Sequence, residues 1–129
     1  MIFNIGTDLV SVKRIDGLIS KNPKFIYRIL TEHEIEKLNT LPDNKRANYV
    51  AKRFSAKEAL AKALGTGIGK LSFQDIAILN HNNGAPYYKI SSKFEEILEK
   101  LANKKEYKLH LSITDDSDYA ISYAIIEVF

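Results

Sequence analysis

The stretch that decides the fold lies in the middle of the chain, where residues 44–67 read NKRANYVAKRFSAKEALAKALGTG. Alanines, the strongest helix formers, fill this stretch. Asp43 or Asn44 can cap its start, and the glycines of residues 65–67 can end it. The pattern predicts a long helix over residues 44–64.

Four shorter elements are predicted before this helix. Residues 2–10 form a short apolar run without a helical stripe, which indicates a strand. Residues 11–20 have apolar side chains at helical spacing, and Asn22-Pro23 ends that helix. Two helical pieces follow over residues 24–30 and 31–41, and the second opens with a capping box of Thr31 and Glu34.

Beyond residue 70 the pattern changes mainly to strands. Residues 71–79 and 87–90 are strand-like, and the turn at residues 81–84 contains Asn83-Gly84, which is typical of hairpins. Ser92 and Glu95 form the expected cap of an amphipathic helix. Residues 107–114 alternate between apolar and polar side chains, and a turn leads to a last strand over residues 119–129. Strands that cluster after the long helix indicate an α+β fold.

Length and composition limit the classes of protein that fit. A chain of 129 residues is expected to form a single domain over residues 1–129. No run approaches the roughly 20 apolar residues of a membrane span, and Asp8 and Lys13-Arg14 interrupt the apolar start that a secretory signal needs. The chain has no cysteine, which excludes disulfides and cysteine-bound metals and favours a cytoplasmic location.

The positive charge is concentrated in the first half of the chain. Residues 11–30 carry five cations against one anion, and residues 45–57 carry five cations and no acid. This distribution fits a docking face for an anionic partner, and it fits a solvated face equally well. Nucleic-acid binding is not expected, because the chain has no basic patch interleaved with aromatic residues.

Glu58 is a carboxylate on the side of the long helix that is expected to face protein. At about 100° per residue it falls among small and aromatic side chains: Ala47, Ala51, Phe54, Ala61 and Gly65. A lone carboxylate there is costly unless a cation or a metal neutralises it. Two interpretations stay open from the residues alone: an ion pair between Glu58 and Lys62 one turn later, or a metal ligand or base with Lys62 directed at an anion.

Two further polar positions permit two interpretations each. Asp8, at the end of the first strand, is either a helix cap or turn former, or, like Glu58, a metal ligand or base. His110 shares one strand face with Ser112 and Thr114, and this polar ridge is either a site or a solvent-exposed face.

A serine-hydrolase triad is disfavoured because no Gly-x-Ser-x-Gly motif occurs. A Walker-type phosphate loop is disfavoured because the glycine-rich residues 65–70 follow a helix instead of opening one.

Four blocks together resemble the holo-acyl-carrier-protein synthases, the small 4′-phosphopantetheinyl transferases. Residues 5–10 (IGTDLV) with Arg14-Ile15 are similar to the amino-terminal motif of that family, and residues 53–68 (RFSAKEALAKALGTGI) resemble its central signature. Residues 71–76 (LSFQDI) with 83–86 (NGAP), and residues 110–115 (HLSITD), are similar to the later blocks. Asp115 departs from the family pattern, in which many members have histidine, so no catalytic role is placed there.

The resemblance implies a fold and a reaction. The fold is a mainly antiparallel sheet packed on a long central helix with additional short helices. The reaction moves the 4′-phosphopantetheine arm of coenzyme A to a serine of apo acyl carrier protein in fatty acid biosynthesis, releasing adenosine 3′,5′-bisphosphate. Asp8 and Glu58 are then the ligands of Mg²⁺, and Glu58 and Lys62 are the catalytic residues. Lys62 neutralises charge on the pyrophosphate, and Glu58 acts as the base.

The resemblance also implies two binding surfaces and an assembly. The residues expected to bind coenzyme A are Lys45, Arg46, Arg53, Lys62, Gly65, Ile68, Pro86 and His110. Those expected to dock the acidic acyl carrier protein are Arg14, Lys21, Lys24 and Arg28. A homotrimer with active sites at its subunit interfaces is expected. The alternative is a binding module without turnover, which has no need for two carboxylates beside a lysine.

Overall fold

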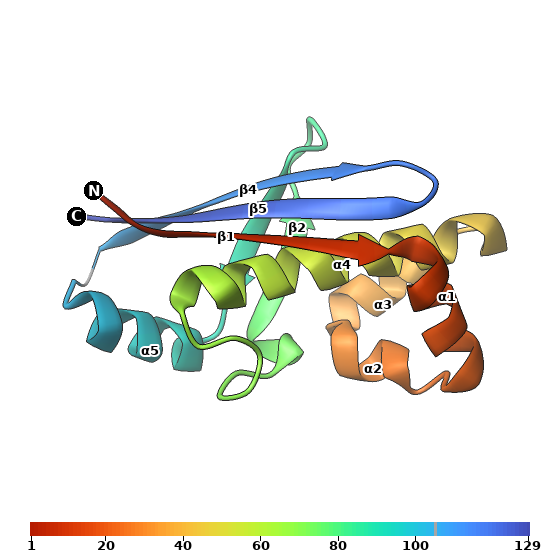
Figure 1. The fold of residues 1–129 in the computed structure, drawn as a ribbon, viewed down its shortest axis with the longest axis horizontal. Helices are drawn as coiled ribbons and strands as arrows, with labels where there is room; N and C mark the ends of the chain where they lie inside the picture. Colours follow the sequence, from red (N-terminus) through yellow and green to blue (C-terminus); the bar gives the residue numbers. More distant parts are fainter. Residues whose placement is uncertain (105) are drawn as a thin grey trace.

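The computed structural model describes residues 1–104 and 106–129 (Figure 1). The first half of the chain forms β1 (Ile2–Ser11), α1 (Val12–Lys21), α2 (Phe25–Ile29), α3 (Glu32–Leu38) and α4 (Asp43–Leu64). The second half forms the 3₁₀ helix η1 (Phe73–Asp75), β2 (Ile76–Asn80), β3 (Pro86–Ile90), α5 (Ser92–Ala102), β4 (Tyr107–Asp115) and β5 (Tyr119–Val128). In the described part of the chain, no helix has the length and apolar character needed to cross a membrane.

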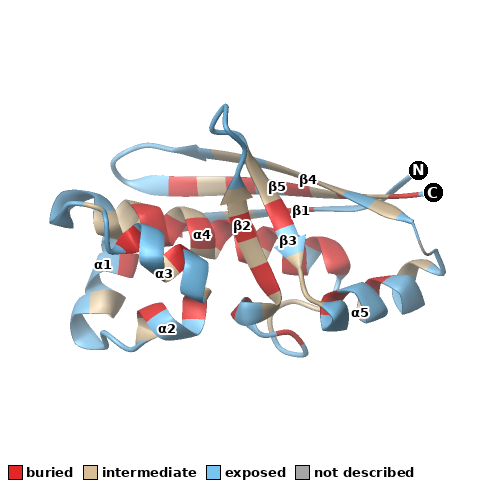
Figure 2. Ribbon diagram, turned by 180° about the vertical axis from the view of Figure 1, so that it is seen from behind, coloured by how far each residue is buried: buried red, intermediate tan, exposed pale blue. Residues whose placement is uncertain are grey.

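Two antiparallel sheets surround the long helix. The first has three strands in the order β1-β5-β4, and the second is the hairpin of β2 and β3. Figure 1 shows α4 running along one face of the three-stranded sheet, with α1–α3 at one end and α5 at the other. The view from behind shows the hairpin crossing over α4 (Figure 2). The expected α+β fold with an antiparallel sheet on a long central helix is confirmed.

Small residues allow α4 to lie very close to the three-stranded sheet. A Cβ atom at Gly6 of β1 would lie 2.0 Å from the carbonyl oxygen of Ala59 and 2.7 Å from the backbone nitrogen of Ala63. Ala120 and Ala124 of β5 are fully buried. Only a glycine at position 6 therefore permits this spacing of strand and helix, and the spacing brings the residues that follow Gly6 into reach of α4.

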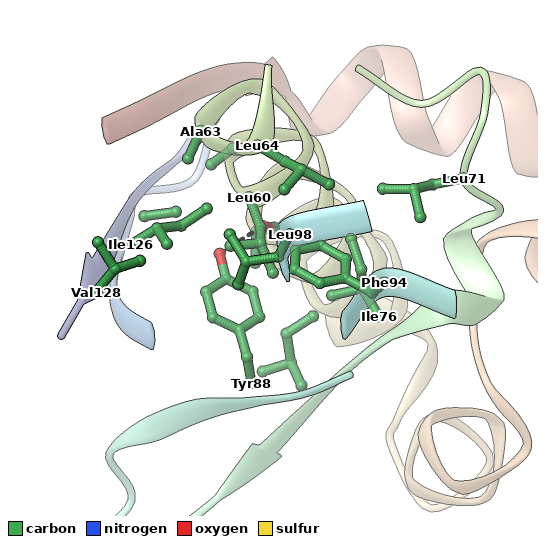
Figure 3. Close-up of a cluster of buried hydrophobic side chains, with 14 residues drawn as sticks. Leu60, Ala63, Leu64, Leu71, Ile76, Tyr88, Phe94, Leu98, Ile126 and Val128 are labelled. Atoms are coloured by element: carbon green, nitrogen blue, oxygen red, sulfur yellow. Dashed lines mark hydrogen bonds between the residues drawn. The ribbon is translucent and has the colours of Figure 1, made fainter. Parts of the chain in front are cut away.

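Two hydrophobic clusters pack against the two halves of α4. The cluster shown in Figure 3 joins α4 to the hairpin, α5 and β5, and its labelled members include Leu60, Phe94 and Ile126. The Tyr88 hydroxyl reaches into it and donates a 2.6 Å hydrogen bond to the Ala56 carbonyl, so its polar atom is satisfied. The second cluster packs α1–α3 against the first half of α4.

Three local predictions are corrected by the structure. α4 begins at Asp43 behind Pro42, which makes no side-chain cap, so neither Asp43 nor Asn44 has the expected capping role. The strand predicted over residues 71–79 begins only at Ile76, because Ser72 and Asp75 cap each other and hold η1 before it. α5 is capped by Ser91 Oγ and not by Ser92.

Other local predictions are confirmed. The capping box of Thr31 and Glu34 opens α3. Gly65 ends α4 in the left-handed region at φ 91°, where a side chain is unfavourable. Gly84, at φ 90°, closes the hairpin turn between β2 and β3.

Candidate active site

Asp8 and Lys62 meet where β1 lies against α4. Side chains alternate along a strand, so Asp8 shares the helix-facing side of β1 with Gly6. Lys62 Nζ donates to Asp8 Oδ1 at 3.0 Å and to the Thr7 carbonyl at 3.1 Å. The Asp8 side chain is 14% exposed and that of Lys62 is 51% exposed. The contact therefore joins a largely buried carboxylate to a cation at the surface.

Glu58 lies half-buried one helical turn before Lys62. Burial raises the pKa of the Glu58 carboxyl above its ordinary value, the negative charge of Asp8 raises it further, and the charge of Lys62 lowers it. Glu58, Asp8 and Lys62 therefore form one electrostatic group. The Glu58–Lys62 ion pair left open by the sequence is not the one formed, because Lys62 reaches across to Asp8 on β1 instead.

The donor set of this group suits a hard divalent cation. Among the described residues no three His, Cys, Asp or Glu side chains gather as a closed metal site. Mg²⁺ does not need such a cage, because it commonly takes one or two carboxylates and completes its shell with water and phosphate oxygens. The proximity of two carboxylates, one with a raised pKa, fits a site that gains from a positive charge.

Arg53 brings a second positive centre into the fold. Its side chain is buried, with 7% of the residue exposed, its Nη2 donates to Asn80 Oδ1 at 2.8 Å, and its guanidinium lies 4.7 Å from the ring centre of Tyr49. In the described part of the chain its Nε has no hydrogen-bond partner, and no carboxylate lies within ion-pair distance. A buried cation in this condition favours an anionic ligand.

The cavity beside Arg53 is mainly basic. It has a volume of about 830 Å³, and its charged lining residues are Lys37, Lys45, Lys52, Arg53, Asp115 and Asp116. Asp115 Oδ2 accepts a hydrogen bond from Asn48 at 3.0 Å, which ties the turn between β4 and β5 to α4. Four cations against two carboxylates make this cavity a candidate for phosphate groups.

The other residues expected to bind coenzyme A are dispersed within one chain. Arg46 donates to the Leu38 carbonyl at 3.2 Å and so ties α4 to α3. Gly65 and Ile68 lie after the far end of α4, and Pro86 begins β3 opposite Asn80. Lys45 and Lys62 are separated by about 25 Å along the helix axis at 1.5 Å per residue. A single chain does not bring all these residues to one point.

His110 lies on the opposite face of the sheet from α4. Its neighbours Leu109 and Leu111 pack on the core, so the alternation of β4 places His110 on the outer face. There its Nε2 lies 3.1 Å from Glu127 Oε1. Within one chain His110 is therefore separated from Glu58 and Lys62 by the sheet.

The outer face of the three-stranded sheet is apolar, a feature that sequence reasoning missed. Four of its side chains are half or more exposed: Ile5, Leu9, Tyr119 and Tyr123. Ile5 pairs with Ile125, and Ile125 pairs with His110 on the next strand, so the apolar side chains and His110 occupy one surface. The sequence does indicate this face, because the apolar residues of β1 and β5 are not confined to alternate positions and therefore occupy both faces of each strand.

Two groups of cations have different environments. Arg14, Lys21, Lys24 and Arg28 are all exposed on or beside α1 and α2, as expected of a docking face. The run at residues 45–57 does not form one exposed face, because Arg53 and Lys57 are buried. Lys57 Nζ is fully enclosed and bonds Glu34 Oε1 at 2.6 Å, the Ile29 carbonyl at 2.7 Å and the Phe73 carbonyl at 3.2 Å.

Comparison with known proteins gives one consistent result. The family model described as the 4′-phosphopantetheinyl transferase superfamily matches residues 4–124. The holo-[acyl-carrier-protein] synthase of Oceanobacillus iheyensis is 42% identical over 127 residues, which cover 98% of each chain.

Two crystal structures are similar along the whole chain. That of the holo-[acyl-carrier-protein] synthase from Neisseria meningitidis has a TM-score of 0.87 at 40% identity, covering 98% of this chain and 99% of that one. The Bacillus anthracis holo-(acyl-carrier-protein) synthase, in complex with CoA (3′,5′-ADP), has a TM-score of 0.84 at 36% identity, covering 100% and 99%.

Proposed function

Because the chain belongs to the 4′-phosphopantetheinyl transferase superfamily, and to the holo-[acyl-carrier-protein] synthases within it, we propose that it transfers 4′-phosphopantetheine from coenzyme A to a serine of apo acyl carrier protein. The products are holo acyl carrier protein and adenosine 3′,5′-bisphosphate. The observation that carries the proposal is the contact of Lys62 with Asp8 where β1 lies against α4, with Glu58 near enough for both charges to shift its pKa.

Asp8 and Glu58 are the residues that would hold Mg²⁺. When bound, the ion neutralises charge on the pyrophosphate and helps to orient it for in-line displacement. The two carboxylates come from different elements, β1 and α4, so the close contact at Gly6 is a condition for their joint action.

Glu58 and Lys62 have complementary roles in the displacement. The serine oxygen forms a bond to the phosphorus of the pantetheine phosphate, and the bond from that phosphorus to the oxygen of adenosine 3′,5′-bisphosphate breaks. Glu58 accepts the serine proton, directly or through one water. Lys62 donates to the pyrophosphate oxygens and stabilises the charge that develops on the leaving group.

Arg53 and Lys45 are proposed to bind the 3′-phosphate of coenzyme A in the basic cavity. The Nε of the buried Arg53, which has no hydrogen-bond partner among residues 1–104 and 106–129, supports this assignment. Arg46 remains assigned to the same phosphate by resemblance, although its hydrogen bond to Leu38 would have to be exchanged. Gly65, Ile68 and Pro86 are proposed to shape the adenine pocket.

A homotrimer with interface active sites is proposed to complete the site. The apolar outer sheet face supports an assembly, because exposed apolar surface of this kind commonly marks an interface. His110 lies on that face, and Lys45 lies about 25 Å from Lys62 along the helix axis, so a neighbouring copy is proposed to bring these residues to the coenzyme. Sedimentation equilibrium should give three times the chain mass, and Tyr123→Glu should shift it toward the monomer.

The carrier protein is proposed to dock on the exposed cations of α1 and α2. These are Arg14, Lys21, Lys24 and Arg28. Acyl carrier proteins are acidic, so complementary charge would accelerate the encounter and make it sensitive to salt. A place in fatty acid biosynthesis, in the cytoplasm, follows from this choice of partner.

Release of adenosine 3′,5′-bisphosphate tests the proposed function. Coenzyme A, apo acyl carrier protein and Mg²⁺ are incubated with the protein, and the nucleotide is quantified by chromatography. Release should require both the carrier protein and Mg²⁺, and a carrier protein with the acceptor serine changed to alanine should give none. Coenzyme A binding without release under these conditions would favour the binding module without turnover.

A further inference from the structure

Lys62 forms an ion pair with Asp8. In the proposed function, however, Asp8 binds Mg²⁺. Lys62 Nζ lies 3.0 Å from Asp8 Oδ1, and the Thr7 carbonyl, 3.1 Å away, holds it from a second side. In the reaction, Asp8 is needed for Mg²⁺ and Lys62 for the pyrophosphate. The observed contact is neither of these.

An ammonium and a divalent cation cannot share Asp8 without cost. Even with the full screening of water, the repulsion between charges of +1 and +2 at about 5 Å corresponds to roughly a tenfold loss of cation affinity. Because Lys62 contacts Asp8 and not Glu58, its ammonium lies directly at a carboxylate that the metal would use.

The Lys62 side chain has the freedom to change partners. It is 51% exposed and extends from the last turn of α4, whereas the Asp8 side chain is 14% exposed and is fixed on β1 beside the tightly packed Gly6. A flexible four-carbon side chain can move its ammonium by several ångströms without disturbing the core. Lys62, and not Asp8, is therefore the group that moves.

We propose that Lys62 and Mg²⁺ compete for Asp8, and that Lys62 leaves Asp8 when the pyrophosphate of coenzyme A offers it another anionic partner. This inference rests on the proposed function. Lys62 then couples the two binding events: the metal binds weakly to the protein alone and more tightly with coenzyme A, because only the nucleotide gives Lys62 a new partner.

Titration with Mn²⁺ tests the competition without an activity assay. Mn²⁺ prefers the same oxygen ligands as Mg²⁺, and electron paramagnetic resonance measures the free ion directly. Lys62→Gln should bind Mn²⁺ about tenfold more tightly than the unchanged protein. Lys93→Gln, which removes the same charge from the exposed surface of α5, should leave the affinity unchanged.

Two further variants locate the effect. Lys62→Arg keeps the charge and should keep the weak affinity. Asp8→Asn added to Lys62→Gln should abolish the gain, because the gained affinity depends on the Asp8 carboxylate. Equal or weaker Mn²⁺ binding by Lys62→Gln would overturn the competition, as would a gain of the same size in Lys93→Gln.

Coenzyme A provides the test of coupling. After correction for the complex of Mn²⁺ with coenzyme A, the nucleotide should raise Mn²⁺ affinity more in the unchanged protein than in Lys62→Gln. Equal enhancement in both would overturn the coupling. Transfer activity of the unchanged protein is measured separately. If it is active but binds Mn²⁺ no more weakly than Lys62→Gln does, only the competition is contradicted. If it is inactive but Lys62→Gln shows the tenfold gain in Mn²⁺ affinity, only the proposed function is contradicted.

Discussion

Gly6→Ala is the substitution that most directly tests how the fold positions the site. The new Cβ would lie 2.0 Å from the Ala59 carbonyl oxygen and 2.7 Å from the Ala63 nitrogen, and both are backbone atoms of a helix that cannot turn aside. Since van der Waals contact needs about 3.4 Å, β1 and α4 must separate by about 1 Å or more. Asp8, two residues along β1, moves away from Glu58 and Lys62 with it.

The magnitude follows from two effects of that separation. Overpacking a core costs about 1–3 kcal/mol of folding free energy, and a rigid backbone contact places this case at the upper end. A displacement of about 1 Å between catalytic groups lowers the rate by about 100-fold. Gly6→Ala should therefore remain largely folded at low temperature and lose activity far in excess of the unfolded fraction.

Urea unfolding and the transfer rate are measured on the same preparations of Gly6→Ala and of Gly17→Ala. Gly17 lies on an exposed side of α1, where an added Cβ meets nothing within 4 Å. Alanine there should stabilise the helix by up to about 1 kcal/mol. Because Gly17 lies between Arg14 and Lys21 of the proposed docking face, the control is read as kcat at saturating carrier protein, which should stay unchanged. Gly6→Ala with normal stability and normal transfer would refute the close packing of β1 on α4 as the device that sets the site.

Three further substitutions test other parts of the account. Glu58→Gln should lower the transfer rate at least 100-fold while the melting temperature rises slightly. The rise is expected because a carboxyl whose pKa is raised by folding opposes folding above its unfolded pKa, and the amide removes that penalty. A matching fall in stability and rate would contradict the catalytic role. Lys57→Met leaves Glu34 buried without its cation and should lower the free energy of unfolding in urea by about 3–5 kcal/mol. A loss below about 1 kcal/mol would show that the Lys57–Glu34 pair is not what joins α2, α3 and η1 to α4. Arg14→Glu should raise KM for carrier protein severalfold and leave KM for coenzyme A unchanged, whereas a parallel rise in both would contradict the docking face.

The elements that could be predicted from the sequence are those fixed by local chemistry. The alanine-rich run and Gly65 specify α4, and Thr31 with Glu34 specifies the start of α3, because each signal acts within a few residues. The error at residues 71–79 has a local cause too. Ser72 and Asp75 form a reciprocal cap whose hydrogen bonds compete with strand pairing.

The partners of charged residues could not be predicted, because they are distant in the sequence. Lys62 has Glu58 at i−4 on its own helix but bonds Asp8, 54 residues away, since the missing side chain of Gly6 brings β1 within reach. Lys57 lies in a run of cations and gives no sign of burial until Glu34 is placed beside it. The family resemblance supplied the candidate residues, and the structure supplied the contacts that relate them.

If Asp8, Glu58 and Lys62 act together as proposed, this chain is a phosphopantetheinyl transferase that depends on all three. Intact-mass spectrometry of apo acyl carrier protein tests it, after incubation with coenzyme A, Mg²⁺ and either the unchanged protein or Glu58→Gln. The carrier protein should gain about 340 Da, the mass of one phosphopantetheine group; the gain should be lost with EDTA and slowed at least 100-fold in Glu58→Gln. No gain with the unchanged protein, or an equal rate with Glu58→Gln, would contradict it.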